Sequence, residues 1–201
     1  MKKTLPVLLL LSGVLPMFAC VHAGPQGSLR IPLRWALGAD DMRDEIPAGA
    51  VDDLNRQTLQ VGAFVDARPD RALVGKNVEK GGGGTVSTPD DVGKFAQDQL
   101  AAILIANGVK LASTGASRII TGEVQRFFVN EGDTYDTDVA LKVRLTDASG
   151  KALWEGVSEG HAHRFGRSFS EQNYQEALSS AFFEAVKDLL ANADFRKSFR
   201  G

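Results

Sequence analysis

The chain has 201 residues, of which 43% are hydrophobic and 24% are charged, and its formal net charge is −2. This composition is typical of a globular protein and argues against a disordered one. The mildly acidic charge argues against nucleic acid as a partner and against electrostatic binding to anionic lipid.

The N-terminus has the three-part order of a secretory signal peptide. Lys2 and Lys3 precede a short apolar run, and Pro16 opens a segment of small and mixed residues. The run is well short of the roughly 20 residues that span a bilayer as a helix, and no later segment approaches that length. We therefore expect residues 1–23 to be a signal peptide and residues 24–201 to form a single exported domain.

Two cleavage sites remain open. Cleavage after Ala23 follows small or branched residues and predicts a free periplasmic protein. Cleavage before Cys20 would leave this cysteine as a lipid-carrying N-terminus, and Val21 in place of an aspartate then points to a tether at the outer membrane. Cys20 is the only cysteine in the chain and follows the apolar run, but the bulky Phe18 departs from the usual lipoprotein signal.

In the N-terminal half, apolar and polar residues alternate over residues 29–35 and again over residues 59–65, which predicts two strands. Residues 40–53 are acidic and interrupted by proline and glycine, so they predict a surface connection with a short helical turn. Residues 72–87 contain four consecutive glycines without the Gly-Lys-Ser/Thr ending of a phosphate-binding loop. We expect a mobile loop there.

Two later segments have helical periodicity. The first has Thr88 as its predicted N-cap, Pro89 in its first position, and Gly108 as a left-handed cap at its end. The second has one wide apolar stripe over residues 174–190 and ends at Asn192, which leaves a basic tail.

Between these helices, residues 118–129, 139–146 and 152–163 alternate and predict a three-stranded meander, with a polar turn over residues 131–137. The alternation slips near Arg126, which indicates a β-bulge. The predicted fold class is therefore α+β. We expect a two-layer sandwich in which two main helices pack on one face of an antiparallel or mixed sheet of about five strands.

The sequence shows no convincing catalytic or metal site, and we expect no enzyme activity, metal or cofactor. No serine lies in a Gly-x-Ser-x-Gly motif. His161 and His163 share one face of their strand with Glu159, which is the basis for a less favoured alternative, a metal-dependent hydrolase. Two imidazoles alone make a weak site, and His22 belongs to the signal peptide.

The end of the second predicted strand carries Asp66, Arg68 and Asp70. Their alternating charges favour mutual pairing that fixes the turn. As a more specific hypothesis, we expect this turn and the exposed edge strands to form a contact surface.

A fixed order of features over residues 55–199 resembles that of the YajG-like envelope lipoproteins. It comprises the Asp-Ala-Arg-Pro-Asp strand end at residues 66–70, a helix from about Asp90 to Ala106, a Gly108-Val109 turn, a strand from Ile119 into a meander, and a final helix ending in Asp194-Phe195. The resemblance implies a small exported protein, usually anchored by lipid at the outer membrane, with no established activity. Residues 17–20 depart from the lipidation motif of that family.

These observations predict a non-enzymatic accessory or binding protein of the cell envelope, which contacts another envelope protein or component. The layout is also similar to that of auxiliary lipoproteins of lipid and polysaccharide transporters. That alternative, an auxiliary subunit of a lipid or glycan transport system, predicts an apolar groove between the sheet and the helices, lined by Phe127, Phe128 and Trp154.

Overall fold

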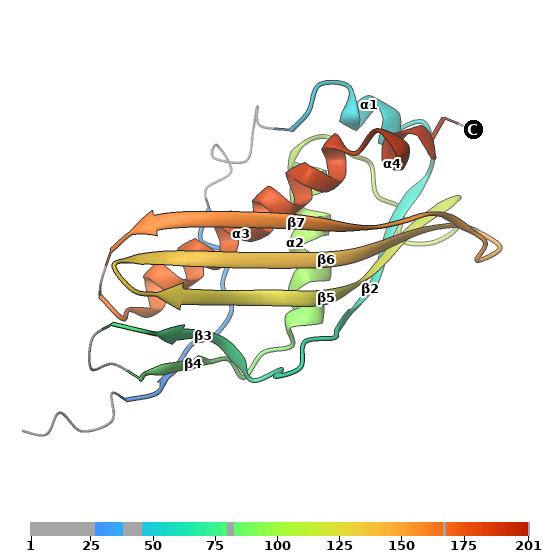
Figure 1. The fold of residues 1–201 in the computed structure, drawn as a ribbon. Coiled ribbons are helices and arrows are strands. Elements are labelled where there is room, and N and C mark those ends of the chain that lie inside the picture. Colours follow the sequence, from blue (N-terminus) through green and yellow to red (C-terminus); the bar gives the residue numbers. More distant parts are fainter. Residues whose placement is uncertain (1–26, 38–45, 80–82, 167, 201) are drawn as a thin grey trace, which may run out of the picture.

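A computed structural model of the chain describes residues 27–37, 46–79, 83–166 and 168–200 (Figure 1). The predicted signal peptide, both cleavage sites and Cys20 lie outside the described residues. Within them, the elements in chain order are β1 (Leu29–Arg30), α1 (Ala50–Leu54), β2 (Leu59–Asp66), β3 (Leu73–Asn77), β4 (Thr85–Ser87), α2 (Val92–Ala106), β5 (Arg118–Glu131), β6 (Thr134–Asp147), β7 (Ala152–Phe165), α3 (Glu171–Ala191) and α4 (Ala193–Lys197).

The strands of the described residues form one mixed, seven-stranded sheet. Its centre is the predicted meander, in which β5, β6 and β7 are antiparallel and 14 residues long each. β2 and β3 both run parallel to β5, and they pair with residues 118–124 and 129–131 in succession. The register of β5 against β6 shifts between Val124 and Arg126, which confirms the predicted bulge.

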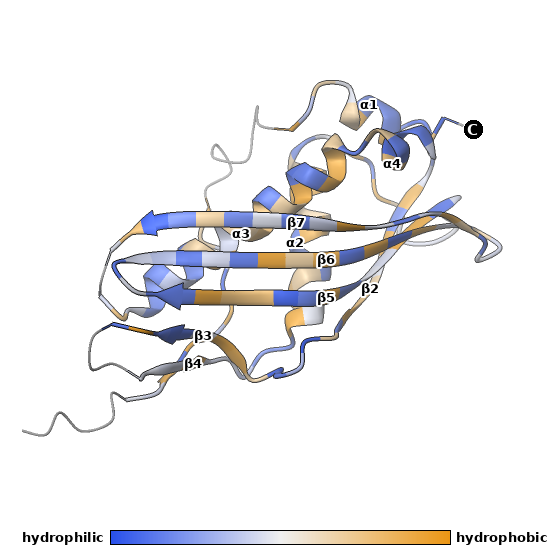
Figure 2. Cartoon of the chain, viewed as in Figure 1, coloured by the Kyte–Doolittle hydropathy of each residue, from blue (hydrophilic) through white to orange (hydrophobic). Residues whose placement is uncertain are grey.

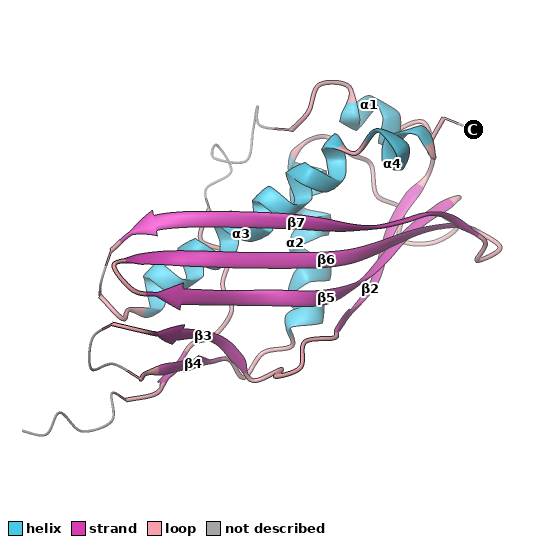
Figure 3. Ribbon diagram, viewed as in Figure 1, coloured by secondary structure: helices cyan, strands magenta, loops and turns pink. Residues whose placement is uncertain are grey.

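The two long helices, α2 and α3, cover one face of this sheet (Figures 1 and 3). α2 packs on β2, whereas α3 packs on β6 and β7. A Cβ atom at Gly160 of β7 would lie 2.0 Å from the carbonyl oxygen of Ala181, so only glycine allows α3 to approach the strand this closely. Within the described residues, no helix combines the length and the apolar character needed to cross a membrane.

The alternation along β6 explains why these residues form a two-layer fold. Figure 2 shows hydrophobic and hydrophilic residues alternating along the central strands. Val139, Leu141, Val143 and Leu145 all point toward the helices and are fully buried. Each such side chain contributes about 1.5–3 kcal/mol when it leaves water, so this face of the sheet supplies much of the stability of the domain.

The N-terminal strands differ from the sequence-based expectation. The strand predicted over residues 29–35 is only two residues long, because Pro32 has no N–H and the backbone N–H of Leu33 donates to the carboxylate of Asp90 at 2.7 Å. The mobile loop predicted over residues 72–87 instead contains β3 and β4. Val74 and Val86 are fully buried there, so these short strands are part of the core.

The start of α2, the end of β5 and the start of β6 also differ from the predicted boundaries. The N-cap of α2 is Asp91 instead of Thr88, because its carboxylate accepts the backbone N–H of Lys94 at 3.1 Å. The predicted polar turn over residues 131–137 is short, since β5 ends at Glu131 and β6 begins at Thr134.

The C-terminal tail is not left over but forms α4, with Phe195 and Phe199 fully buried. Arg200 donates to both carboxylate oxygens of Asp53 at 3.0 and 2.8 Å, which lowers the pKa of this carboxyl group. The predicted helical turn near Asp53 (α1) and the glycine cap of α2, with a φ of 88° at Gly108, are confirmed.

Candidate functional site

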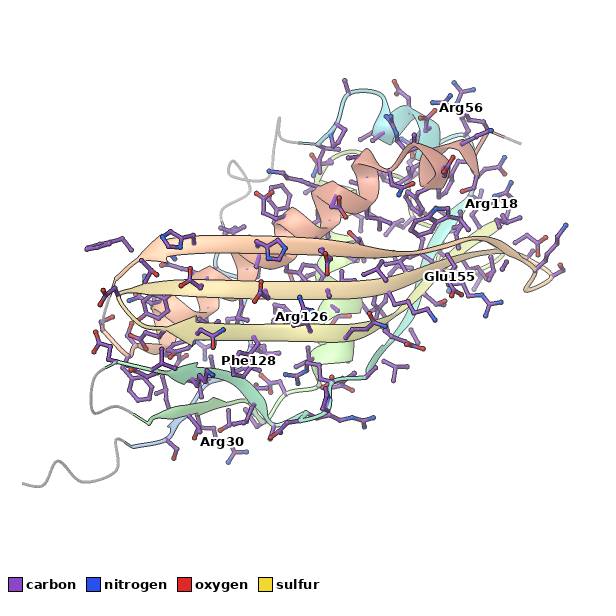
Figure 4. All side chains as sticks on the ribbon, in the orientation of Figure 1. Arg30, Arg56, Arg118, Arg126, Phe128 and Glu155 are labelled. Atoms are coloured by element: carbon purple, nitrogen blue, oxygen red, sulfur yellow. The ribbon has the colours of Figure 1, made fainter. Side chains whose placement is uncertain are left out.

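The face of the sheet opposite α2 and α3 is not covered by any other element of the described residues. Side chains of β5, β6 and β7 point outward on it, and Figure 4 shows Arg126, Phe128 and Glu155 among them. We call this surface the open face. Its residues lie opposite one another on neighbouring strands, and along each strand they alternate with residues that point toward the helices. They are Arg126, Phe128, Asp136, Asp138, Lys142, Arg144, Glu155, Val157, Glu159, His161 and His163.

Charged residues pair across the strands of the open face. Lys142 lies 3.2 Å from Glu155, and Arg144 lies 3.9 Å from the same carboxylate. Arg126 lies 3.9 Å from Glu159. All these side chains are about half exposed, and exposed ion pairs of this kind contribute at most about 1 kcal/mol each. The pairs can therefore be rearranged by a partner at little energetic cost.

The two histidines of β7 each face an aspartate of β6. The Nδ1 atom of His161 lies 2.6 Å from the carboxylate of Asp138, and that of His163 lies 2.5 Å from Asp136. The hydrogen bond with His163 is the main cause that lowers the pKa of Asp136. Each imidazole is thus engaged with its own carboxylate on the neighbouring strand.

The hydrolase alternative required a third metal ligand, for which Glu159 was the candidate. Glu159 shares the face of the two histidines, as predicted from the strand, but its carboxylate faces Arg126. Among the described residues, no group of three or more histidine, cysteine, aspartate or glutamate side chains is arranged to hold a metal ion.

The turn after β2 is organised around a buried arginine. Arg68 donates from Nε and Nη2 to the two carboxylate oxygens of Asp66, at 2.9 and 2.8 Å, and it also donates to the carbonyl oxygens of Arg71 and Leu73, at 2.6 and 2.5 Å. Burial alone would raise the pKa of Asp66, but the hydrogen bonds and charge of Arg68 outweigh it, and the pKa is lowered. The geometry therefore supports pairing that fixes the turn.

The position of Arg68 corrects its assignment to a contact surface, because its side chain is only 4% exposed. The physical reason lies in the sheet. β2 leaves β5 at Asp66 and β3 joins β5 at Gly75, so a gap opens along β5 between them. The guanidinium group fills this gap, with Nη1 3.4 Å from the carbonyl oxygen of Phe127. Asp70 remains exposed and accepts backbone N–H groups of the turn.

A hollow of about 380 Å³ lies beside this turn. It is lined mostly by apolar groups and brings together Asp70, from the predicted contact turn, and Phe127 and Phe128, from the predicted groove. The remaining lining residues are Arg68, Pro69, Leu73, Gln125 and Arg126. The bulge near Arg126 was the sequence signal for this site, because bulges redirect side chains.

The three predicted groove residues do not share a groove between the sheet and the helices. Phe127 is fully buried and packs edge-to-face on Phe95 of α2, with ring centroids 5.8 Å apart. Trp154 packs on Phe195 of α4 at 5.0 Å, far along the sheet from the hollow. Only Phe128 lies on the open face. The groove on which the lipid or glycan transport alternative was based is therefore not formed by these residues.

One buried carboxylate, that of Glu131, is not predicted by any pattern in the sequence. Glu131 is fully buried and accepts hydrogen bonds from the hydroxyl groups of Tyr135 and Tyr174 and from the backbone N–H of Phe169, each at 2.7 Å. Burial, and then the Glu131 carboxylate, raise the pKa of Tyr174 far above its ordinary value. This cluster holds the segment before α3 against the β5–β6 turn. The one hint of this cluster in the sequence is that its two hydroxyl donors, Tyr135 and Tyr174, are the only tyrosines in the chain.

Neither a protein-family model nor a curated protein matches the sequence. Among solved structures, the chain is similar to protein XCC0632 of the DUF330 family from Xanthomonas campestris, with 12% identity, a TM-score of 0.53, and coverage of 85% of this chain and 96% of that one. A candidate lipoprotein from Caulobacter crescentus CB15 has 14% identity and a TM-score of 0.47, with 77% and 98% coverage. PelC from Paraburkholderia phytofirmans, solved as a dodecamer, has 19% identity and a TM-score of 0.41, with 67% and 89% coverage.

The similarity to XCC0632 shows a shared α+β fold that extends over most of both chains. It supports the predicted fold class and shows no activity or partner. The relation to the YajG-like proteins stays a prediction, because it rests on the order of elements and on a few short sequence patterns.

Proposed function

We propose that this protein is an exported, non-enzymatic accessory protein of the bacterial cell envelope, which is anchored by an acylated Cys20 and binds another envelope protein through its open face. One observation carries the proposal: the helices cover a single face of the sheet, and the other face exposes its side chains within the described residues. A bare antiparallel face can also stay in water, so the exposed Val157 and the apolar hollow on this face are what favour a partner there.

The chemistry of the open face suits a protein partner. Val157 is 52% exposed in the middle of β7, between charged neighbours. Phe128 and Arg126 border the hollow, and aromatic residues and arginine are enriched at protein interfaces. An apolar side chain of a partner would fill the hollow, while the exposed ion pairs around it would exchange partners at the rim.

The anchor is tested by the intact mass of the mature protein from membrane and periplasmic fractions of its native host. We expect a chain that begins at Cys20 and carries acyl groups, in the membrane fraction. A chain that begins at Gly24 in the periplasmic fraction would contradict the anchor, because the only cysteine would have been removed.

The contact surface is tested by placing a charge on it. Val157→Glu is expected to reduce co-purification of the partner at least tenfold, because a carboxylate would have to be buried in the interface. Ile105→Glu is the matched control, since Ile105 is 59% exposed on α2, away from the open face. Equal co-purification with both variants, at unchanged stability, would refute the open face as the contact surface.

A further inference from the structure

One end of the molecule carries two exposed apolar side chains. Phe165, the last residue of β7, is 91% exposed, and Val78, just after β3, is 52% exposed. Both flank the turn between β5 and β6. The Cα of Phe165 pairs with that of Thr134, and the backbone N–H of Val78 donates to the carbonyl oxygen of Glu131 at 2.7 Å. We call this the β5–β6 end; it lies at the left in Figure 1.

The first described residue lies at the same end. The carbonyl oxygen of Gly27 is 3.2 Å from the position that a Cβ atom of Gly84 would occupy. Gly84 in turn accepts the backbone N–H of Asn77 at 2.8 Å, next to Val78. A continuous set of contacts therefore connects the N-terminal segment to the β5–β6 end.

Chain length then limits the distance between this end and a lipid anchor. Cys20 precedes Gly27 by seven residues, and a chain of that length reaches at most about 25 Å when fully extended. The strands β5 to β7 have 14 residues each, which corresponds to roughly 46 Å. The opposite end, at the turn around Gly150, is therefore too far from Gly27 to be the end held at the membrane.

We infer that the β5–β6 end rests on the phospholipid surface to which the chain is anchored, with Phe165 and Val78 inserted among the headgroups. This inference depends on the proposed acylation of Cys20. The free energy falls when aromatic and aliphatic side chains leave water at such an interface.

The charges at this end are of both signs. Among the described neighbours of the two apolar side chains, Lys76 and Glu79 have opposite charges and Arg164 is paired with Glu176, so these residues form no basic cluster that would select anionic lipid. Contact should therefore occur on neutral phospholipid and be insensitive to salt. The long strands would stand away from the membrane, and the open face would be presented sideways to a partner in the same envelope layer.

The test uses the mature full chain, anchored at Cys20 to vesicles of phosphatidylcholine and phosphatidylethanolamine. Native acyl groups or coupling of the Cys20 thiol to a maleimide lipid supply the anchor, and vesicle flotation verifies it. The photoreactive residue p-benzoylphenylalanine replaces Phe165, or Lys151 at the opposite end as the control. Both positions are exposed.

We expect at least fivefold more lipid adduct from position 165 than from position 151, unchanged in 0.5 M salt. Equal adducts from both positions on floating vesicles would overturn the inference. Adducts to another protein instead of lipid, in native membranes, would also overturn it. The maleimide-anchored chain reports on the β5–β6 end even if the native intact mass shows that Cys20 is not acylated, so the two proposals fail separately.

Discussion

The two faces of the central sheet belong to the same three strands but have opposite properties. Val143 points toward the helices and is fully buried, whereas Val157 on the adjacent strand points away and is 52% exposed. The covered face is apolar and closely packed on α2 and α3, and the open face consists of weak cross-strand ion pairs around a small apolar hollow. Stability is therefore concentrated on the covered face, which leaves the open face available for contact.

The largest expected difference is between two arginines near β5. Arg68→Leu should lower the free energy of unfolding by about 3–5 kcal/mol, because it leaves the largely buried carboxylate of Asp66 without its partner. Arg126→Leu on the open face is the control and should cost less than about 1 kcal/mol. Urea unfolding measures both values. Similar losses for the two variants would contradict the structural role of Arg68.

A valine in each face gives a more closely matched pair. Val143→Ala should lower the free energy of unfolding by about 2 kcal/mol, since it removes buried methyl groups and leaves a cavity. Val157→Ala should change it by less than about 0.5 kcal/mol. Thermal or urea unfolding would detect the difference. A loss at Val157 as large as that at Val143 would mean that the open face is part of the core.

A third pair compares two glutamates. Glu131→Gln should cost about 1–3 kcal/mol, because the amide cannot accept all three hydrogen bonds that the buried carboxylate receives. Glu159→Gln on the open face should cost less than about 0.5 kcal/mol. Native-state hydrogen exchange of the backbone N–H of Phe169 offers a local measure, and it should accelerate only in the first variant.

The smallest expected effect is on the pH dependence of stability. The pKa of Asp66 is lower in the folded protein than its unfolded value near 3.9. Its contribution is therefore fully present above that unfolded value and is lost as the pH falls through the folded pKa. Unfolding measured between about pH 5 and 2 should show a shallower pH dependence in Arg68→Leu than in the wild type, with Arg126→Leu unchanged.

The sequence predicted the elements whose pattern is local. The meander was identifiable because its long strands alternate between a buried and an exposed face, and the bulge near Arg126 interrupts this alternation. The end of α2 was identifiable from Gly108, which adopts a left-handed φ of 88°.

Features that depend on distant residues were not predicted. β3 and β4 have five and three residues and show no clear alternation. Gly75 of β3 packs tightly against Tyr174 of α3, a contact invisible in the local pattern. Glu131 falls in a predicted polar turn, since glutamate is rarely buried, and its donor Tyr174 lies 43 residues further along the chain.

For the candidate site, the two-residue period of a strand rules out the predicted groove. Phe127 and Phe128 are adjacent in one strand, so their side chains point to opposite faces and cannot both line one groove between sheet and helices. The turn at Asp66 to Asp70 was correctly identified as internally paired, but the burial of Arg68 follows from the gap between β2 and β3. That gap exists only once both strands pair with β5.

The accessibility of two thiols tests directly whether a partner covers the open face. Val157→Cys on the open face and Ile105→Cys on α2 are labelled with a hydrophilic maleimide, once in purified protein and once in native envelopes. We predict that Cys at position 157 reacts at least tenfold more slowly in the envelope than in purified protein, and that the rate at position 105 is the same in both. Equal rates at position 157 in the two preparations would contradict a partner on the open face.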